Sequence, residues 1–518
     1  MKQKRIVLIV LVVVLVLSLA LVGLTACGNK DKNKGNKKAI IYVTALFGGG
    51  LYNDETKAPA WDPFFTEMDL YDHVDDEGNM DFIGILGEYT GDTSDDRDWD
   101  DEGQYGGIMT MLTSALTFEE GTLLYDLSLD QDGNPLNPHV VPATLDSKDK
   151  DGNLLHVYYG AVGIYKPFIV NPQEEFKDYD VLVFNQDWRK NPAESAALLE
   201  QFINRAGYEE VILMSHSMGG QVCNSYLARS EANRNKVKRY LAFAPATLGS
   251  FDAYAAMTCP LEYMTSFLAT FNLDLSSLNL QMIDINAMIQ GGLDAVAPFF
   301  NNSEGMMALC PAWELLSSDQ YANNAQGGFV IDGRRISSKE ELYEFYERMP
   351  WAFYLDEEGN KMKVDDTSNV PAGWYINKDG YRIKPGVAKI TQLGFYENMY
   401  VDGKIAMNYV DEYIFVGRGI TSTITGINLT TIGEDEDGYP IYSYEIVHAD
   451  QAEVGEEGWI GGDGQVCLYA SLAGQSYAEM KAANRLIEIP GRWHMDIGGC
   501  WAILGTDVMR LIREAANN

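Results

Sequence analysis

The chain has 518 residues, enough for one large domain with insertions or for two to three domains. Its apolar content of 46%, with 30 tyrosines and 20 phenylalanines, indicates a packed globular core and excludes a disordered chain. The formal net charge is −36, and because no basic patch lies beyond the extreme N-terminus, we expect no nucleic-acid partner. Acidic runs are expected to be solvated loops, since the segments 146–153 and 433–440 both lack the spacing of an EF-hand calcium site.

The N-terminus resembles the export signal of a bacterial lipoprotein. A basic head precedes an apolar run that ends in LTAC (24–27), which looks like a lipobox, so residues 1–27 are the predicted signal peptide. By that resemblance Cys27 becomes the lipidated first residue, and residues 28–38 form a flexible tether. An uncleaved transmembrane anchor is the alternative, because roughly 19 apolar residues could just span a bilayer. In both cases we expect an extracytoplasmic protein anchored to the cell membrane.

Strands and helices then alternate, which is typical of a mostly parallel α/β sheet covered by helices on both faces. Buried strands are predicted at 38–50, 180–188, 209–215 and 239–247, and helices at 191–207 and 219–233. The alternation stops after 250, where a Met-, Leu- and Phe-rich helical stretch (261–300) and hairpins with glycine turns are predicted. Strands resume at 411–420 and 485–491, before a last helix at 499–515. The predicted division is a core over 39–250 with an insertion at about 52–175, a cap or lid over 251–405, and the rest of the core over 406–518.

Five cysteines remain besides Cys27. They show no metal-ligand spacing and are too sparse for a disulfide scaffold. Cys223 lies in an apolar helical stretch and is expected to be a buried thiol. Cys259 and Cys310 could form a disulfide bond, which the sequence leaves open. No metal ion or other cofactor is expected.

Two serines flank a histidine in VILMSHSMGG (211–220), where a predicted strand meets a predicted helix. In α/β-hydrolases the nucleophilic serine lies on such a strained turn, with small residues two positions away on either side. Ser217 satisfies this pattern, with Ser215 in place of the usual first glycine and Gly219 as the second. A nucleophile at Ser215 would put the bulky Leu213 at a small position. Ser217 is therefore the predicted nucleophile.

A serine hydroxyl needs a base to take its proton and an acid to orient that base. Only two histidines follow the nucleophile. His494 lies after a strand and before the last helix, where this fold places its base, whereas His448 has no such context. Asp463, in a glycine-flanked loop between the last two strands, is the predicted acid. Asp496 is too close to the base in sequence, and Asp187 precedes the nucleophile.

The oxyanion of the tetrahedral intermediate needs backbone N–H donors. One is expected from Met218, directly after the nucleophile. The other is expected from the loop that follows the first strand, at Leu46 with Phe47 as the next choice. The side chain of His216 is expected to point away from the Ser217 hydroxyl and to be structural.

Seven segments occur in an order that resembles the lecithin:cholesterol acyltransferase family, which includes the lysosomal phospholipases: 184–192, 211–220, 241–250, 309–316, 417–426, 462–472 and 491–497. The resemblance implies an α/β-hydrolase fold with a large cap, and an acyl-serine intermediate whose acyl group passes to water or to an alcohol. It implies the same nucleophile, acid, base and oxyanion donor: Ser217, Asp463, His494 and Leu46.

The resemblance also covers Asp187-Trp188-Arg189. We interpret Trp188 and Arg189, together with Phe47, as contacts of the pocket or cap, while a buried ion pair that supports the core is an equal alternative. The acidic segment 52–175 is unlike the family, which leaves the lipid preference open.

The leading hypothesis is a serine esterase acting on lipid esters: a phospholipase, a lipase or an acyltransferase. The Met- and Phe-rich stretch 254–309 would shelter the acyl chain. Its partners would be the lipid ester and, through Cys27, the membrane surface. The alternatives are a surface-anchored binding protein with a non-catalytic hydrolase fold, or an esterase for non-lipid esters.

Overall fold

The computed structural model describes residues 37–57, 59–61, 120–144, 147–148, 152, 162–263, 297–322, 327–364, 370–450 and 458–517. The predicted signal peptide with Cys27, most of the tether, most of the insertion and most of the predicted helical stretch 261–300 lie outside these ranges. Within them, no helix is long and apolar enough to cross a membrane.

Six parallel strands form the central sheet, in the order β17-β14-β7-β6-β1-β5. They are β1 (Lys37–Val43), β5 (Tyr179–Phe184), β6 (Tyr208–His216), β7 (Val237–Phe243), β14 (Glu412–Arg418) and β17 (Leu486–Pro490). Val43 pairs with Ser215, and Ser215 pairs with Ala242, so β1, β6 and β7 end side by side. In open α/β sheets, ligands bind beyond these carboxyl ends, where the order of the strands reverses. Here that reversal falls between β1 and β6.

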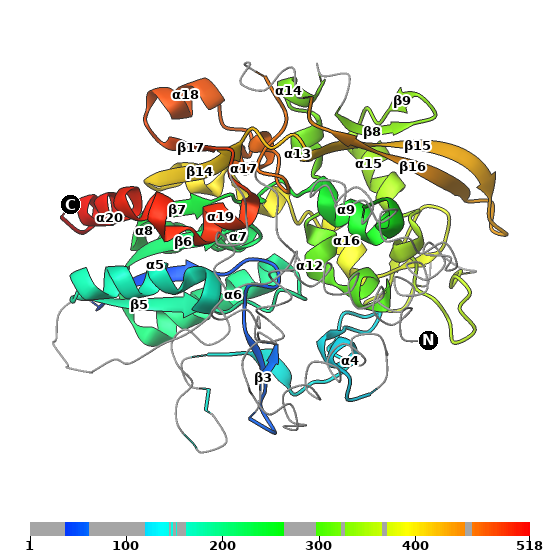
Figure 1. Ribbon diagram of the computed structural model, residues 1–518. Helices are drawn as coiled ribbons and strands as arrows, with labels where there is room; N and C mark the ends of the chain where they lie inside the picture. Colours follow the sequence, from blue (N-terminus) through cyan, green and yellow to red (C-terminus); the bar gives the residue numbers. More distant parts are fainter. Residues whose placement is uncertain are drawn as a thin grey trace, which may run out of the picture.

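Helices cover both faces of the sheet (Figure 1). They are α5 (Val162–Glu175), α6 (Pro192–Ala206), α7 (Gly219–Arg229), α19 (His494–Gly499) and α20 (Trp501–Asn517). Ile41 and Leu213 belong to the core that includes side chains of α6 and α7. Ile40 and Ile212 belong to a second core with side chains of α5 and α20. Neighbouring strand residues thus point to opposite faces, and the predicted α/β fold is confirmed.

The predicted helix 219–233 is two helices in the structure. α7 ends at Arg229, and α8 spans Glu231–Lys236. Ser230 between them is extended, with φ −160° and ψ 155°, and its hydroxyl accepts a hydrogen bond from the backbone N–H of Asn233. A serine in this position starts a new helix, because it satisfies one of the free N–H groups of the first turn.

A cap lies between β7 and β14 in the sequence and to the right of the central sheet in Figure 1. Its helices are α9 (Phe251–Thr258), α12 (Glu304–Ala308), α13 (Trp313–Leu316), α14 (Asp319–Ala322), α15 (Lys339–Tyr346) and α16 (Pro385–Thr391), with the short 3-10 turns Pro350–Ala352, Glu397–Met399 and Ala406–Tyr409. Two short antiparallel pairs accompany them: β10 (Tyr375–Ile376) with β11 (Arg382–Ile383), and β12 (Tyr400–Val401) with β13 (Lys404–Ile405).

A separate four-stranded sheet completes the cap, in the order β16-β15-β8-β9. Its strands are β8 (Gly328–Ile331), β9 (Arg334–Arg335), β15 (Ile424–Glu434) and β16 (Pro440–His448). β15 and β16 follow the core strand β14 in the sequence, yet β15 runs parallel to β8 of the cap. Residues 424–448 thus form one sheet with β8 and β9, which lie in the segment predicted as the cap.

The described part of the insertion forms a small sheet beside the first loop of the core. It consists of β2 (Leu51–Asn53), β3 (Pro59–Trp61), β4 (Val140–Pro142) and the helix α4 (Leu123–Leu127). Two further helices, α17 (Leu468–Leu472) and α18 (Tyr477–Ala482), lie between β14 and β17 in the sequence. All five cysteines of the described ranges are free thiols, so Cys259 and Cys310 do not form the disulfide bond that the sequence left open.

Candidate active site

Ser217 lies on a strained turn between β6 and α7. Its φ is +54°, in the left-handed region that a side chain disfavours. The two residues at the start of α7 must be glycines because the chain passes so close. A Cβ at Gly219 would lie 2.6 Å from the carbonyl oxygen of Val43, and a Cβ at Gly220 would lie 2.6 Å from Cβ of Pro245. The sharp turn places Ser217 in the wall of a cavity at the carboxyl end of the sheet.

Ser215 does not reach the same space. Its side chain is fully buried, and its hydroxyl lies 2.7 Å from that of Tyr240 within the core. The first small position of the turn is thus occupied by a side chain that is satisfied in the interior. Of the two serines, only Ser217 lines the cavity beyond the sheet.

His494 and Asp463 form a buried pair. His494 is the first residue of α19, and its Nδ1 lies 2.9 Å from Oδ2 of Asp463. The other oxygen of Asp463 accepts hydrogen bonds from the backbone N–H groups of Gln465 and Val466, at 3.1 and 2.7 Å. The backbone N–H of His494 also donates to the carbonyl of Asp463, at 2.8 Å. These contacts fix the orientation of the carboxylate and leave Nε2 of the ring free for other partners.

Glycine again makes room for the acid. A Cβ at Gly417, near the end of β14, would lie 2.4 Å from Cβ of Asp463. Gly464 has φ +95°, and a Cβ there would lie 2.3 Å from the ring of Trp493. The glycines of 462–464 and of β14 therefore allow the acid loop to pack against the base.

One cavity brings the predicted residues together. Ser217 and His494 both line it, and Asp463 lies directly behind His494. Within the ranges that the structure describes, the Ser217 hydroxyl makes no hydrogen bond with His494. Such bonds are often long before a substrate is bound. The rest of the wall is mainly apolar: Ala45, Leu46, Phe47, Ala246, Ala253, Ala256, Met257, Pro260, Ala297, Phe300, Met306, Leu309, Val466 and Met495.

The loop after β1 presents unpaired N–H groups to this cavity. The N–H of Ala45 donates to the Tyr165 hydroxyl, and the N–H of Gly48 donates to the carbonyl of Ala45. Leu46 and Phe47 also line the cavity, and within the described part of the chain their N–H groups make no hydrogen bond. The same holds for the N–H of Met218. These are the donors from which the sequence predicted an oxyanion hole, and Phe47 has a strained φ of +57°.

Asp252, near the start of α9, adds a carboxyl group to the cavity wall that the sequence gave no reason to expect. The Ser250 hydroxyl donates to the carbonyl of Gln465 at 2.5 Å and lies 3.3 Å from Oδ2 of Asp252. The hydroxyl of Tyr263 also bonds to this carboxyl. Burial raises the pKa of Asp252 well above its ordinary value.

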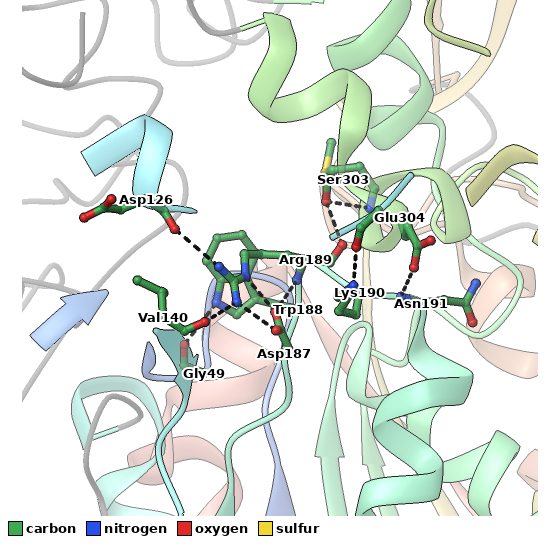
Figure 2. A network of polar contacts seen from close by, with 12 residues as sticks. Gly49, Asp126, Val140, Asp187, Trp188, Arg189, Lys190, Asn191, Ser303 and Glu304 are labelled. Atoms are coloured by element: carbon green, nitrogen blue, oxygen red, sulfur yellow. Dashed lines mark hydrogen bonds and ion pairs between the residues drawn. The ribbon is translucent and has the colours of Figure 1, made fainter. Parts of the chain in front are cut away.

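The segment Asp187-Trp188-Arg189 does not line the cavity and forms the polar network drawn in Figure 2. The Arg189 guanidinium donates to both oxygens of Asp187, at 2.8 and 2.9 Å, and to the carbonyl of Val140 at 2.7 Å. The Trp188 indole N–H donates to the carbonyl of Gly49 in the loop after β1, at 3.0 Å. Arg189 and Asp187 thus form a buried ion pair, and Trp188 contacts the loop after β1.

The cap joins this network through α12. The backbone N–H of Gly305 donates to the carbonyl of Arg189 at 3.1 Å, and a Cβ at Gly305 would lie 2.0 Å from the carbonyl oxygen of Trp188. The Trp188 ring also packs against Phe47 and Phe299, with centroids 4.6 and 6.1 Å apart. The segment thus contacts the cap, the insertion and the loop after β1 at once.

The other histidine and the rejected acid lie elsewhere. His448 ends β16 and its Nδ1 lies 2.8 Å from the carbonyl of Ser422. Asp496 accepts a hydrogen bond from the backbone N–H of Trp493 at the start of α19. Neither residue lines the cavity.

A serine on a strained strand-to-helix turn, at the carboxyl edge of a parallel sheet, is the arrangement of the α/β-hydrolases, and the chain has this fold. Residues 176–392 match the sequence model of lecithin:cholesterol acyltransferase, which supports the resemblance that the sequence motifs indicated. The match supports, in general, an acyltransferase or ester hydrolase of lipids.

The crystal structure of the Tle4–Tli4 complex is similar over 90% of this chain and 96% of that chain, with 13% sequence identity and a TM-score of 0.38. Comparison with curated proteins gives no match.

Proposed function

We propose that this protein is a serine hydrolase that cleaves acyl esters of lipids through an acyl-serine intermediate on Ser217. In this proposal His494 is the general base, and Asp463 orients its ring and stabilises its positive charge. The acyl group passes to water, as in a phospholipase or lipase, or to an alcohol, as in an O-acyltransferase. The observation that carries the proposal is the meeting of Ser217 and the buried His494–Asp463 pair at one cavity.

The proposed reaction has two balanced steps. Oγ of Ser217 attacks the ester carbonyl carbon while its proton passes to Nε2 of His494, and the oxyanion accepts hydrogen bonds from the N–H groups of Met218 and Leu46. Collapse of this intermediate breaks the bond to the alcohol, which leaves with the proton from His494. Water or a second alcohol then gives its proton to the same ring and attacks the carbonyl carbon of the acyl-serine. Collapse of this second intermediate breaks the bond to Oγ, which takes the proton back from His494, so that Ser217 is regenerated.

Labelling with a fluorophosphonate probe tests the nucleophile. The wild type is expected to be labelled and Ser217→Ala is not. Ser215→Ala is the matched control, because Ser215 is buried against Tyr240 and should leave labelling unchanged. No labelling of the wild type, or equal labelling of Ser217→Ala, would reject the catalytic proposal and favour a non-catalytic binding protein.

The mainly apolar cavity wall and the family support lipid esters as substrates. Mass spectrometry of the products from phosphatidylcholine and triacylglycerol vesicles, with and without an added alcohol, tests this point. Free fatty acid indicates hydrolysis, and a new ester indicates transfer. Cleavage of short soluble esters alone would reject the lipid proposal and leave a general esterase.

We also propose attachment to the membrane surface through a lipidated Cys27, which rests on the sequence LTAC at 24–27. Metabolic labelling with a fatty acid should mark the wild type in the membrane fraction, whereas Cys27→Ser should remain unlabelled. A labelled Cys27→Ser protein would place the lipid elsewhere.

A further inference from the structure

His216, the histidine between the two serines, has both ring nitrogens in hydrogen bonds. Nδ1 lies 3.0 Å from the hydroxyl of Tyr165, and Nε2 lies 3.1 Å from the main-chain carbonyl oxygen of His494. The ring is fully buried, and it has no role in the reaction proposed above. These contacts connect the turn of the nucleophile to the main chain of the base.

The partners fix where every proton lies. The carbonyl oxygen of His494 can only accept, so Nε2 of His216 carries the hydrogen. A neutral ring then accepts at Nδ1, so Tyr165 donates to it. The Tyr165 oxygen in turn accepts from the N–H of Ala45, at 3.2 Å. Three hydrogen bonds therefore run in one direction, from the N–H of Ala45 to the carbonyl of His494.

The surroundings keep this chain of bonds in a single state. Burial, with the nearby His494, lowers the pKa of His216 well below its ordinary value, so the ring stays neutral. Gly498 of α19 lies against the ring, since a Cβ there would be 2.4 Å from its atoms. The hydroxyl of Tyr42 donates to the carbonyl of Gly498 at 2.9 Å, and the Tyr42 and Tyr165 rings pack 4.5 Å apart.

The two ends of the chain of bonds belong to the two halves of the catalytic apparatus. Ala45 begins the loop whose next N–H groups, at Leu46 and Phe47, face the cavity unpaired. His494 is the proposed base. The loop after β1 and the start of α19, which are far apart in the sequence, are thus connected through His216, the neighbour of Ser217.

We propose that His216 and Tyr165 are positioning residues that fix the oxyanion loop relative to the base. This inference rests on the proposed function. Neither residue carries a proton in the reaction. The N–H of Ala45 can only donate and the carbonyl of His494 can only accept, so the protons between them stay in place. Their effect comes from orientation, which is worth large factors in rate when reacting groups must meet within a fraction of an ångström.

Tyr165→Phe tests the inference, because it removes the hydroxyl and keeps the ring. With a p-nitrophenyl ester as substrate, we expect kcat to fall about 10- to 100-fold while KM changes less than about twofold. Affinity for an alkyl boronic acid, which forms a tetrahedral adduct on the serine, should fall by the same factor as kcat/KM. A purely structural change would not produce this match.

His216→Gln supplies the second variant. Both residues belong to one chain of bonds. The double variant Tyr165→Phe/His216→Gln should therefore lose no more activity than the less active of the two single variants. Tyr226→Phe is the matched control: Tyr226 is a buried tyrosine of α7 whose hydroxyl has no partner within the described residues, and its kcat should equal that of the wild type.

The outcomes separate this inference from the proposed function. A wild type that no fluorophosphonate labels would reject the proposed function. A labelled, active wild type with unchanged kcat and boronic acid affinity in Tyr165→Phe would overturn only the positioning role. Additive losses in the double variant would overturn it as well, since independent effects add.

Discussion

At the scale of single residues, the site depends on backbone conformations that side chains disfavour. Ser217 has φ +54° because β6 must turn sharply into α7. The main chain on the other side of the turn is closer than a Cβ would permit, which accounts for Gly219 and Gly220. Strain of this kind persists where the surrounding packing enforces it, and it is concentrated at functional sites.

This strain predicts an order of stability for two inactive variants. The free energy of unfolding of Ser217→Gly should be about 1 kcal/mol higher than that of Ser217→Ala, because glycine adopts a positive φ without a Cβ clash. Urea unfolding of the two variants measures the difference. A more stable Ser217→Ala protein would mean that the turn is not strained in solution.

The three predicted chemical residues could be read from the sequence because each lies in a short, local pattern. Ser217 is marked by its flanking small residues, and Asp463 and His494 by strand, loop and helix context. The hydrogen bond between Tyr165 and His216 could not be found in this way, since it joins residues 51 apart in the sequence. The carboxyl of Asp252 was also missed, because an aspartate after Ser250 has the pattern of an ordinary helix start.

At the scale of elements, the segment 187–189 connects parts of the molecule that are separate in sequence. The guanidinium of Arg189 donates to Val140 in β4 of the insertion, and the main-chain carbonyl of Arg189 accepts a hydrogen bond from Gly305 in α12 of the cap. Figure 2 shows the network around Arg189. The side chains of Arg189 and Asp187 are only 1% and 11% exposed. A charge in such surroundings is stable only with its partner present.

Removing the guanidinium should therefore be costly. Arg189→Met leaves the Asp187 carboxylate buried without a countercharge and is expected to lower the free energy of unfolding by about 3–5 kcal/mol. Arg229→Met is the matched control. Its partner is Glu200 at 2.6 Å, but their side chains are 43% and 22% exposed, and the loss should stay below about 1 kcal/mol. Equal losses in denaturant titrations would contradict this account.

At the scale of the whole molecule, buried acids make stability depend on pH. Burial raises the pKa of Glu412, at the start of β14, from 4.5 to about 7, and the contact with Arg485 at 3.2 Å offsets only part of that rise. Between these two values the folded protein holds a proton that the unfolded chain has released. Stability must then fall as the pH rises through this window.

Glu412→Gln removes this dependence, because glutamine is neutral at every pH. Relative to the wild type, the variant should gain about 3 kcal/mol in free energy of unfolding between about pH 4.5 and 7. Glu175→Gln should show the opposite sign, since a hydrogen bond from Arg513 lowers the pKa of Glu175. Parallel stability curves for Glu412→Gln and the wild type would contradict the prediction.

The central sheet could be predicted from the sequence almost strand by strand, because buried parallel strands are continuous apolar runs. The cap could not. Its sheet pairs β15 with β8, a contact between segments on either side of the core strand β14, and no local pattern encodes such a partner. The hairpin of β15 and β16 was not predicted either.

The pairing of β15 with β8 means that the cap cannot be exchanged as one continuous segment. After the core strand β7, the chain forms β8 and β9 of the outer sheet and then the core strand β14. The outer sheet is completed by β15 and β16, which follow β14. Exchanging the cap for that of a relative by cutting at two points would separate β15 from β8. An exchange that keeps this sheet intact must therefore replace both excursions together. Neither excursion contains all four strands of the outer sheet.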